Sequence, residues 1–404
     1  MTTPAAPVTP AVRARVAALT PEELPAYLYD LAALRAHAAT VRAALPERVE
    51  LHYAAKANPE PALLTALADH VDGYEISSGG ELAHVRGVLP DAALAFGGPG
   101  KTVTEMATAL RIGVHRWHVE SVSELHQLAA LATELRPTTP VDILLRVNLP
   151  VAGDALDGVP LAMGGRPTPF GLDPTDVPHC LRLLDTAPFA ALRLRGIHAH
   201  LASGLDAPAQ LALAEQIVSW AGTLAERFGR SFEEVNLGGG MAVDYADPSA
   251  RFDWAAYGSG LARLLASHPG LRLRIEPGRA LTAYCGWYAT EVLDVKRSHG
   301  EEFAVVRGGT HHLRTPATRG HSQPFSVLPV AQWAHPWDRP GTAGGPVTLC
   351  GQLCTPKDAL AQRAAVAELR AGDRVAFALA GAYAWNISHH EFLMHPRPGF
   401  HFLS

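Results

Sequence analysis

Short apolar runs recur along the first two thirds of the chain and alternate with stretches of helical composition. The runs are flanked by Gly and Pro and lack strict alternation, which is typical of strands buried on both faces. Eight runs fit this description: residues 50–58, 73–78, 94–99, 116–121, 142–150, 194–203, 234–240 and 272–278. Parallel strands need crossover helices, and eight strand–helix units complete a ring. The pattern favours an α/β fold with a (β/α)8 barrel of the TIM type; an open doubly wound sheet is the alternative.

The intervening stretches are rich in Ala, Leu, Glu and Arg, and three of them are residues 59–70, 121–136 and 207–229. Ser121, with Glu124 three residues later, is typical of a helix start. In the last stretch, apolar residues repeat at helical spacing and predict its inward face. These residues are Leu211, Ala214, Ile217, Val218 and Ala221.

After about residue 280 the pattern changes to alternating strands bounded by Gly and Pro. The strand-like stretches are residues 286–297, 302–308, 346–354 and 374–383, and PAYLYD (25–30) is a further candidate. We therefore expect a barrel over 30–280 and a C-terminal, mostly antiparallel β-domain made of 281–404 plus 1–29. The Gly/Pro-rich connection 150–170 is typical of a functional lid or an insertion.

Composition excludes several classes of protein. With 48% hydrophobic and 18% charged residues in 404, the chain can bury a large core and is not disordered. The net charge of -5, from 39 acids and 34 bases, argues against a nucleic-acid partner. No apolar run approaches the ~18 residues of a membrane span. Four cysteines without an export signal predict a reduced, cytoplasmic chain.

Two charged residues stand at the ends of predicted barrel strands, where barrel enzymes place their sites. Lys56 lies among alanines in HYAAKANP. If it faces the interior, desolvation lowers its pKa and frees a neutral amine to condense with an aldehyde, although a snorkelling lysine fits equally well. Glu276, close to Arg279, could keep a heterocyclic nitrogen protonated and leave the arginine for phosphate; a plain ion pair is the alternative.

Three further segments carry candidate chemistry. The glycines 238–240 allow backbone N–H groups to approach phosphate, or make a plain turn, and their spacing is not that of a dinucleotide site. In GIHAHLASG, His198 and His200 share a face, so an imidazole could stack on an aromatic cofactor beside a Ser203 donor, or fill the core. Cys350 and Cys354 lack a second pair at zinc-finger spacing, so no metal is expected, and Cys354 is a proton donor or an inert thiol.

The motifs YAAKAN, SSGGEL, HAHLASG, NLGGG, EPGR, LCTPKD and GAY appear in this order along the chain. In this respect the chain resembles, over nearly its whole length, the pyridoxal-phosphate-dependent decarboxylases of the alanine-racemase-like fold (fold type III). That family includes diaminopimelate, ornithine and arginine decarboxylases. The resemblance implies a pyridoxal 5′-phosphate cofactor and a homodimer with two shared active sites.

The resemblance also implies roles for individual residues. Lys56 would hold the cofactor covalently, His200 would stack on its pyridine ring, and Glu276 would face the ring nitrogen. Cys354 would reach into the partner subunit's site, and Cys354 or Lys56 would return the proton after decarboxylation. The implied phosphate cradle consists of Ser203, Gly238, Gly239, Gly240, Gly278, Arg279 and Tyr383. A racemase of this fold would offer arginine to the ring nitrogen, so Glu276 favours decarboxylation.

Departures from the family pattern concern the substrate. The residue after the cysteine, usually an acid that pairs with a distal amine, is Thr355 here. The segments 308–316 and 385–398 are rich in His and Arg. This change favours an anionic, oxygen-rich distal group, as in the siderophore-biosynthesis branch, which acts on a citrate-conjugated diamino acid. Candidate substrate-binding residues are His311, His312, Arg314, Thr355, Lys357 and Asp358.

Two other functions remain open from the sequence. One is a diaminopimelate decarboxylase of lysine biosynthesis, or an ornithine- or arginine-type decarboxylase. The other is a non-catalytic pyridoxal-phosphate carrier, against which the additional β-domain with Cys354 and Tyr383 argues.

Overall fold

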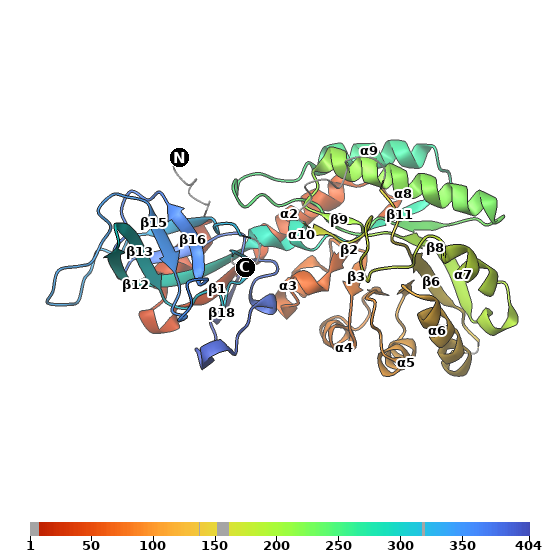
Figure 1. Cartoon of the computed structure of the whole chain (residues 1–404), viewed down its shortest axis with the longest axis horizontal. Helices are drawn as coiled ribbons and strands as arrows, with labels where there is room; N and C mark the ends of the chain where they lie inside the picture. Colours follow the sequence, from red (N-terminus) through yellow and green to blue (C-terminus); the bar gives the residue numbers. More distant parts are fainter. Residues whose placement is uncertain (1–7, 137, 152–160, 317–319) are drawn as a thin grey trace. The chain divides into compact units, whose positions relative to one another are not determined.

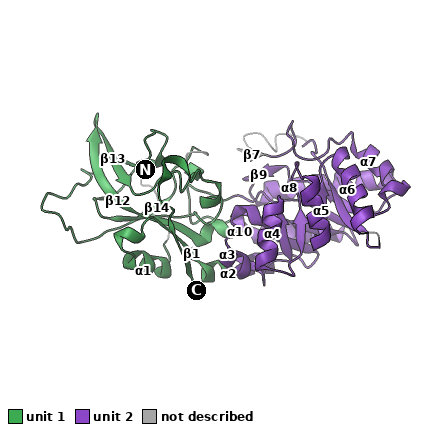
Figure 2. Ribbon diagram, turned by 90° about the horizontal axis from the view of Figure 1, so that it is seen from below, with its two compact units in different colours: residues 1–34, 243–251, 282–404 green, residues 35–242, 252–281 purple. Residues whose placement is uncertain are grey.

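The computed structural model describes residues 8–136, 138–151, 161–316 and 320–404. The chain divides into two compact units (Figure 2). Unit 1 consists of residues 1–34, 243–251 and 282–404, and unit 2 of residues 35–242 and 252–281. The short segment 243–251, which lies between two stretches of the barrel unit in the sequence, therefore belongs to unit 1.

Unit 2 is a closed barrel of parallel strands, so the open-sheet alternative is wrong. Leu273↔Val49 is in the parallel register that closes the ring between its last and first strands. Each of the eight expected apolar runs overlaps one barrel strand, as expected for runs buried on both faces. They are β2 (Val49–Ala54), β3 (Gly73–Ile76), β4 (Leu94–Phe96), β5 (Arg116–Val119), β6 (Val141–Arg146), β8 (Leu192–His198), β10 (Glu234–Asn236) and β11 (Arg272–Ile275).

Helices lie outside this ring of strands (Figure 1). The expected start of α6 is confirmed, since the Glu124 N–H donates to Ser121 Oγ at 3.0 Å. On α8 the expected inward face is buried except for Leu211, which is partly exposed. Leu211 instead packs on α9, where a Cβ at Gly260 would meet its Cδ2 at 2.3 Å. The helices are α2 (Leu31–Ala44), α3 (Pro61–Leu67), α4 (Gly79–Val88), α5 (Val103–Ile112), α6 (Val122–Leu135), α7 (Val177–Leu183), α8 (Ala207–Arg227), α9 (Trp254–Ala266) and α10 (Arg279–Thr282).

Unit 1 contains an 8-stranded sheet in the order β14-β17-β12-β13-β15-β16, with β1 paired to β12 and β18 paired to β1. Pairing is antiparallel except between β1 and β18 and between β13 and β15. Residues 26–30 of PAYLYD form β1, and its partner β18, like β14 and β16, was not expected. The strands are β1 (Ala26–Asp30), β12 (Gly286–Ser298), β13 (Glu301–Val306), β14 (Phe325–Leu328), β15 (Val347–Cys350), β16 (Ala359–Ala364), β17 (Arg374–Phe377) and β18 (Gly399–Leu403).

Helix α1 (Pro10–Ala18) covers part of this sheet, with Val12 and Val16 in one apolar cluster with Leu28 and Trp287. In the barrel unit, β7 (Leu161–Ala162) pairs with β9 (Ala202–Ser203). The lid expected at 150–170 falls partly on 152–160, outside the described residues, and stays a prediction. Among the helices that the structure describes, none is long and apolar enough to cross a membrane.

Candidate active site

Lys56 and Glu276 lie at the same, carboxyl end of the barrel. Lys56 belongs to a short 3₁₀ turn, Ala55–Ala57, directly after β2, and Glu276 directly follows β11. These two strands are hydrogen-bonded neighbours, and beyond their ends the Ala54 N–H donates to the Pro277 carbonyl at 3.3 Å. Carboxyl ends of parallel strands form the functional face of such barrels.

The environment of Lys56 differs from the expected apolar one. Its side chain is 44% exposed, and Nζ donates to Glu75 Oε2 at 2.6 Å. Glu75, on β3, is buried and also accepts from Ser77 Oγ at 2.8 Å. With 44% of the side chain exposed, the condition for desolvation, a lysine enclosed by the barrel interior, is not met. Glu75 was missed, although an acid at the end of the run GYEISS carried the same signal as Glu276.

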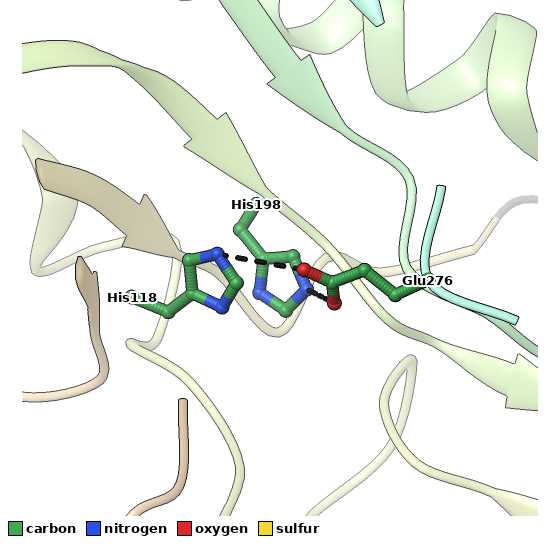
Figure 3. A group of neighbouring side chains, drawn as sticks. All are labelled: His118, His198 and Glu276. Atoms are coloured by element: carbon green, nitrogen blue, oxygen red, sulfur yellow. Dashed lines mark ion pairs between the residues drawn. The ribbon is translucent and has the colours of Figure 1, made fainter. Parts of the chain in front are cut away.

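Glu276 is a buried carboxylate surrounded by neutral polar groups (Figure 3). Its Oε1 accepts from Asn236 Nδ2 at 2.7 Å, and the Nε2 atoms of His118 and His198 lie 3.7 and 3.4 Å from its two oxygens. Burial raises the pKa of Glu276 above 4.5, and the Asn236 hydrogen bond opposes this rise. Within the described ranges no Lys or Arg forms an ion pair with this carboxylate, so the plain ion pair with Arg279 is not observed.

His200 follows β8 at the same end of the barrel. Its Nδ1 accepts from the Gly239 N–H at 3.1 Å, so we assign its proton to Nε2. Burial lowers the pKa of His200 well below 6.5, which makes it a neutral imidazole at pH 7. Gly238 has φ +68°, and a Cβ there would lie 2.6 Å from His200 Cβ, so glycine is required for the close approach.

The expected phosphate donors come from three neighbouring strands, β8, β10 and β11. Ser203 lies beyond β8, the glycine loop beyond β10, and Gly278 and Arg279 beyond β11. The N–H groups of Gly238 and Gly239 already donate within the chain, to Asn236 Oδ1 and His200 Nδ1. The phosphate cradle expected from Ser203, Gly238, Gly239, Gly240, Gly278 and Arg279 stays a prediction.

The remaining expected site residues belong to unit 1. Cys354 and Lys357 are exposed, and Thr355 is half-buried. Asp358 is buried, and its carboxylate accepts from the N–H groups of Thr310 and Leu353 at 2.6 and 2.8 Å. The Asp358 carboxylate therefore holds the backbone of two loops together, and its expected contact with substrate stays a prediction.

The two adjacent histidines of unit 1 are buried, which changes the charge expected near the substrate. Burial lowers the pKa of His311 to about 4 and that of His312 to about 3, so both are neutral at pH 7. His312 is also held by Tyr288 Oη and the Pro396 carbonyl, both at 3.0 Å. Among the expected substrate-binding residues, the positive charge therefore comes from Lys357 and Arg314, both of which are exposed.

His311 and Tyr383 have distinct surroundings in unit 1. Both ring nitrogens of His311 are buried without a hydrogen-bond partner among the described residues. Tyr383 has φ 49°, in the left-handed region, and its carbonyl accepts from Thr315 Oγ1 at 2.6 Å. His311 therefore has unused hydrogen-bonding groups in a fully buried position, whereas Tyr383 is held in a strained backbone conformation of the kind found at functional sites.

Comparisons with known proteins agree with this geometry. Residues 31–283 match the family model described as "Pyridoxal-dependent decarboxylase, pyridoxal binding domain". The chain is 36% identical, over 94% of both sequences, to the 2-[(L-alanin-3-ylcarbamoyl)methyl]-2-hydroxybutanedioate decarboxylase of Staphylococcus aureus. It is 30% identical to the diaminopimelate decarboxylase of Zymomonas mobilis, over 82% of this chain and 75% of that protein. The fold is similar to that of the M. jannaschii diaminopimelate decarboxylase, solved with L-lysine, with a TM-score of 0.83, 20% identity, and coverage of 100% of this chain and 94% of that one. The chain therefore belongs to the pyridoxal-dependent decarboxylases and is an enzyme of the carboxy-lyase class.

Proposed function

We propose that this enzyme uses pyridoxal 5′-phosphate to remove the α-carboxylate of a citrate-conjugated diamino acid in siderophore biosynthesis. The observation that carries the proposal is the 36% identity, over 94% of both chains, to the staphylococcal enzyme. The name of that enzyme describes a hydroxybutanedioate joined through an amide to carbon 3 of alanine. Such a substrate has an amino-acid end for the reaction and a distal end with two carboxylates.

The residues at the barrel end fit the cofactor. A buried carboxylate is costly without a proton or a cationic partner. No Lys or Arg of the described residues forms an ion pair with Glu276, and the charges of Lys56, Arg274 and Arg146 act on it only from further away. A protonated pyridine nitrogen is such a partner. Lys56 supplies an amine at the same end of the barrel, and Arg279 and Ser203 supply donors suited to phosphate. The donor set matches the ring nitrogen, the aldehyde and the phosphate of the cofactor.

The chain's own residues then have separate tasks. Lys56 anchors the cofactor, and Glu75 orients the amine because its Oε2 accepts a hydrogen bond from Nζ at 2.6 Å. Glu276 keeps the ring nitrogen protonated, while His200 presents a neutral imidazole. When bound, the cofactor supplies an electron sink for the electron pair left by departing CO2. Cys354 or Lys56 returns a proton to the α-carbon.

Substrate selection is assigned to exposed cations of unit 1. Arg314 and Lys357 offer donors for distal carboxylates, and Thr355 stands where an acid would repel them. Cys354, next to Thr355, would complete the active site of the partner subunit in a cytoplasmic homodimer. Tyr383 would contribute to the phosphate cradle.

The assay compares two substrates, citryl-diaminopropionate and meso-diaminopimelate, each with purified enzyme and added cofactor. We expect CO2 release from the citryl compound with a kcat/KM at least about tenfold higher, a difference of ~1.4 kcal/mol. Release only from meso-diaminopimelate would contradict the substrate assignment. Lys56→Ala is the control, since it should abolish both the yellow colour and turnover.

The dimer is tested by mixing two inactive variants. Lys56→Ala and Cys354→Ala each lose activity, but a dimer with one copy of each keeps one intact shared site. Activity should therefore reappear after the two variants are unfolded and refolded together. No recovery, or a monomer in light scattering, would contradict shared sites.

Diaminopimelate decarboxylation is the second candidate function. It is favoured by the 30% identity to the Zymomonas enzyme and is decided by the same pair of substrates. The non-catalytic carrier has no such support, because the chain belongs to a family of decarboxylases and is similar to them over 94% of its length.

A further inference from the structure

Two imidazoles lie together against the Glu276 carboxylate (Figure 3). His118 comes from β5 and His198 ends β8, and both side chains are buried. Their rings stack at a centroid distance of 4.2 Å with an interplanar angle of 11°. His198 Nε2 lies 3.4 Å from one carboxylate oxygen and His118 Nε2 lies 3.7 Å from the other. Each ring therefore faces one oxygen of the same acid.

The amide of Asn236 has only one possible orientation. Its Oδ1 accepts from the Gly238 N–H at 2.9 Å, so Nδ2 must point the other way. There Nδ2 donates to Glu276 Oε1 at 2.7 Å and lies 3.3 Å from His118 Nε2. Because Nδ2 is only a donor, His118 must accept at Nε2, and we assign its proton to Nδ1.

This arrangement keeps both imidazoles neutral. A proton on His118 Nε2 would face the Asn236 donor, and burial also holds the pKa of His118 and of His198 well below 6.5. His118 acts through Asn236, whose amide it holds by accepting at Nε2, and that amide donates to Glu276 Oε1. His198, with its proton on Nε2, directs an N–H toward Oε2. Neither neutral group cancels the charge of the carboxylate. The charge of Glu276 therefore remains available to a cation that is not part of the chain.

The same three groups also form a possible ligand set for a metal, since their ligand atoms lie within 4.8 Å of one another. The ring geometry argues against this use. A metal is bound by in-plane lone pairs that converge at ~2.0–2.1 Å, whereas rings stacked at 11° direct their lone pairs nearly parallel. A carboxylate oxygen instead needs an N–H donor, which the Asn236 amide supplies to Oε1 and which a proton on His198 Nε2 would direct toward Oε2.

We propose that His118, His198 and Asn236 form a neutral positioning group that directs the Glu276 carboxylate at a protonated ring nitrogen without neutralising it. This inference rests on the proposed function. It assigns to His118 and His198 a selective effect on the ring nitrogen, which a purely structural role would not have.

The test compares two probes that differ only at the ring nitrogen: pyridoxal 5′-phosphate and its 1-deaza analogue, which has carbon there. Affinities are measured by equilibrium dialysis with cofactor-depleted full-length protein. His118→Phe and His198→Phe keep a flat ring but remove the nitrogens. Each should weaken pyridoxal phosphate binding about tenfold, or ~1.4 kcal/mol, and leave deaza-analogue binding unchanged.

Two further variants separate this effect from general damage. His118→Gln offers an amide oxygen to Asn236 and should restore most of the affinity. His52→Phe removes another buried barrel imidazole, beside Glu50, and should alter neither affinity. His118→Ala and His198→Ala, which add no volume, carry the same test if a Phe variant does not fold.

Equal weakening of both probes would show a structural role and overturn the inference. Stoichiometric Zn²⁺ binding by wild type that both His variants lose would also overturn it. A wild-type protein that binds no pyridoxal phosphate contradicts the proposed function itself. If the wild type binds pyridoxal phosphate more tightly than the deaza analogue and both His variants keep this preference, the positioning role of His118 and His198 is overturned, but the proposed function is not.

Discussion

Three strands, β5, β10 and β11, carry two successive layers of polar side chains into the barrel. Residues two apart on a strand face the same side, so Arg116, Glu234 and Arg274 form a lower layer. His118, Asn236 and Glu276 form the upper layer, two residues further along. In the lower layer both arginines pair with Glu234, at 2.8 and 3.1 Å, and each has a second carboxylate partner.

The upper layer has one carboxylate and no paired cation within the part of the chain that the structure describes. The charges of the lower layer are paired with one another and with neighbouring carboxylates, so this layer stabilises the barrel. The upper layer leaves a charge that needs a partner, which is what a binding site for a cation requires. The same strands thus build a structural layer and a functional layer, and the difference lies in charge pairing rather than in burial.

The largest expected effect comes from breaking the lower layer. Arg274→Met removes the buried partner of Glu50 and one of the two buried arginines that pair with Glu234, which should cost about 3–5 kcal/mol of unfolding free energy in urea. Arg272→Met, which removes a half-exposed partner of Glu50, should cost under ~1 kcal/mol. Equal losses of unfolding free energy for both variants would show that the buried ion pairs of the lower layer contribute no special stability.

Breaking the upper layer should affect turnover instead. Glu276→Gln removes the charge opposite the ring nitrogen, and we expect kcat to fall by ~10²–10³. Stability should rise slightly at pH 7, because burial raises the pKa of Glu276 and so penalises its charged form. That penalty grows as pH rises above 4.5, so the gain should vanish near pH 4. A gain that persists in acid would contradict this explanation.

Acid should destabilise unit 1 through its neutral histidines. His311 and His312 have pKa values lowered to about 4 and about 3, so the unfolded chain binds more protons than the folded one below pH 6.5. Each therefore costs at most ~1.4 kcal/mol per pH unit as pH falls from 6.5 toward these values. His311→Gln should flatten the loss of thermal stability between pH 6.5 and 4. The same slope in wild type and variant would refute the assignment.

The smallest effect is expected at the exposed cations. Lys357→Ala should raise the KM for the citryl substrate a few-fold, or by ~0.5–1 kcal/mol, and the effect should shrink in high salt. Lys296→Ala, an exposed lysine on β12, is the matched control. A KM that is unchanged at low salt would remove Lys357 from substrate binding.

Much of the fold could be predicted from the sequence because local pattern and tertiary role agree. Each barrel strand is a short apolar run ended by Gly or Pro, and the Ser121 cap needs only its own helix. Strands β14 and β18 were missed because their partners are distant in sequence. β18, for example, is defined by pairing with β1 more than 370 residues earlier.

Site residues could be predicted where the residue type alone indicates the chemistry. They could be predicted less well where the role depends on hydrogen-bond or ion-pair partners from other strands. The positions of Lys56 and Glu276 followed from strand ends, but the pairing of Lys56 with Glu75 could not be read from one run. Burial likewise turned His311 and His312 from expected cations into neutral groups. His118 lies in the expected strand 116–121, yet its role depends on the orientation of Asn236, which comes from β10.

A crystal structure of the enzyme with pyridoxal 5′-phosphate tests the central claim most directly. The account predicts a covalent bond between Lys56 Nζ and the cofactor, a Glu276 oxygen within hydrogen-bond distance of the ring nitrogen, and an unchanged lower layer. A ring nitrogen that faces solvent or an arginine, with Lys56 Nζ not bonded to the cofactor, would contradict it.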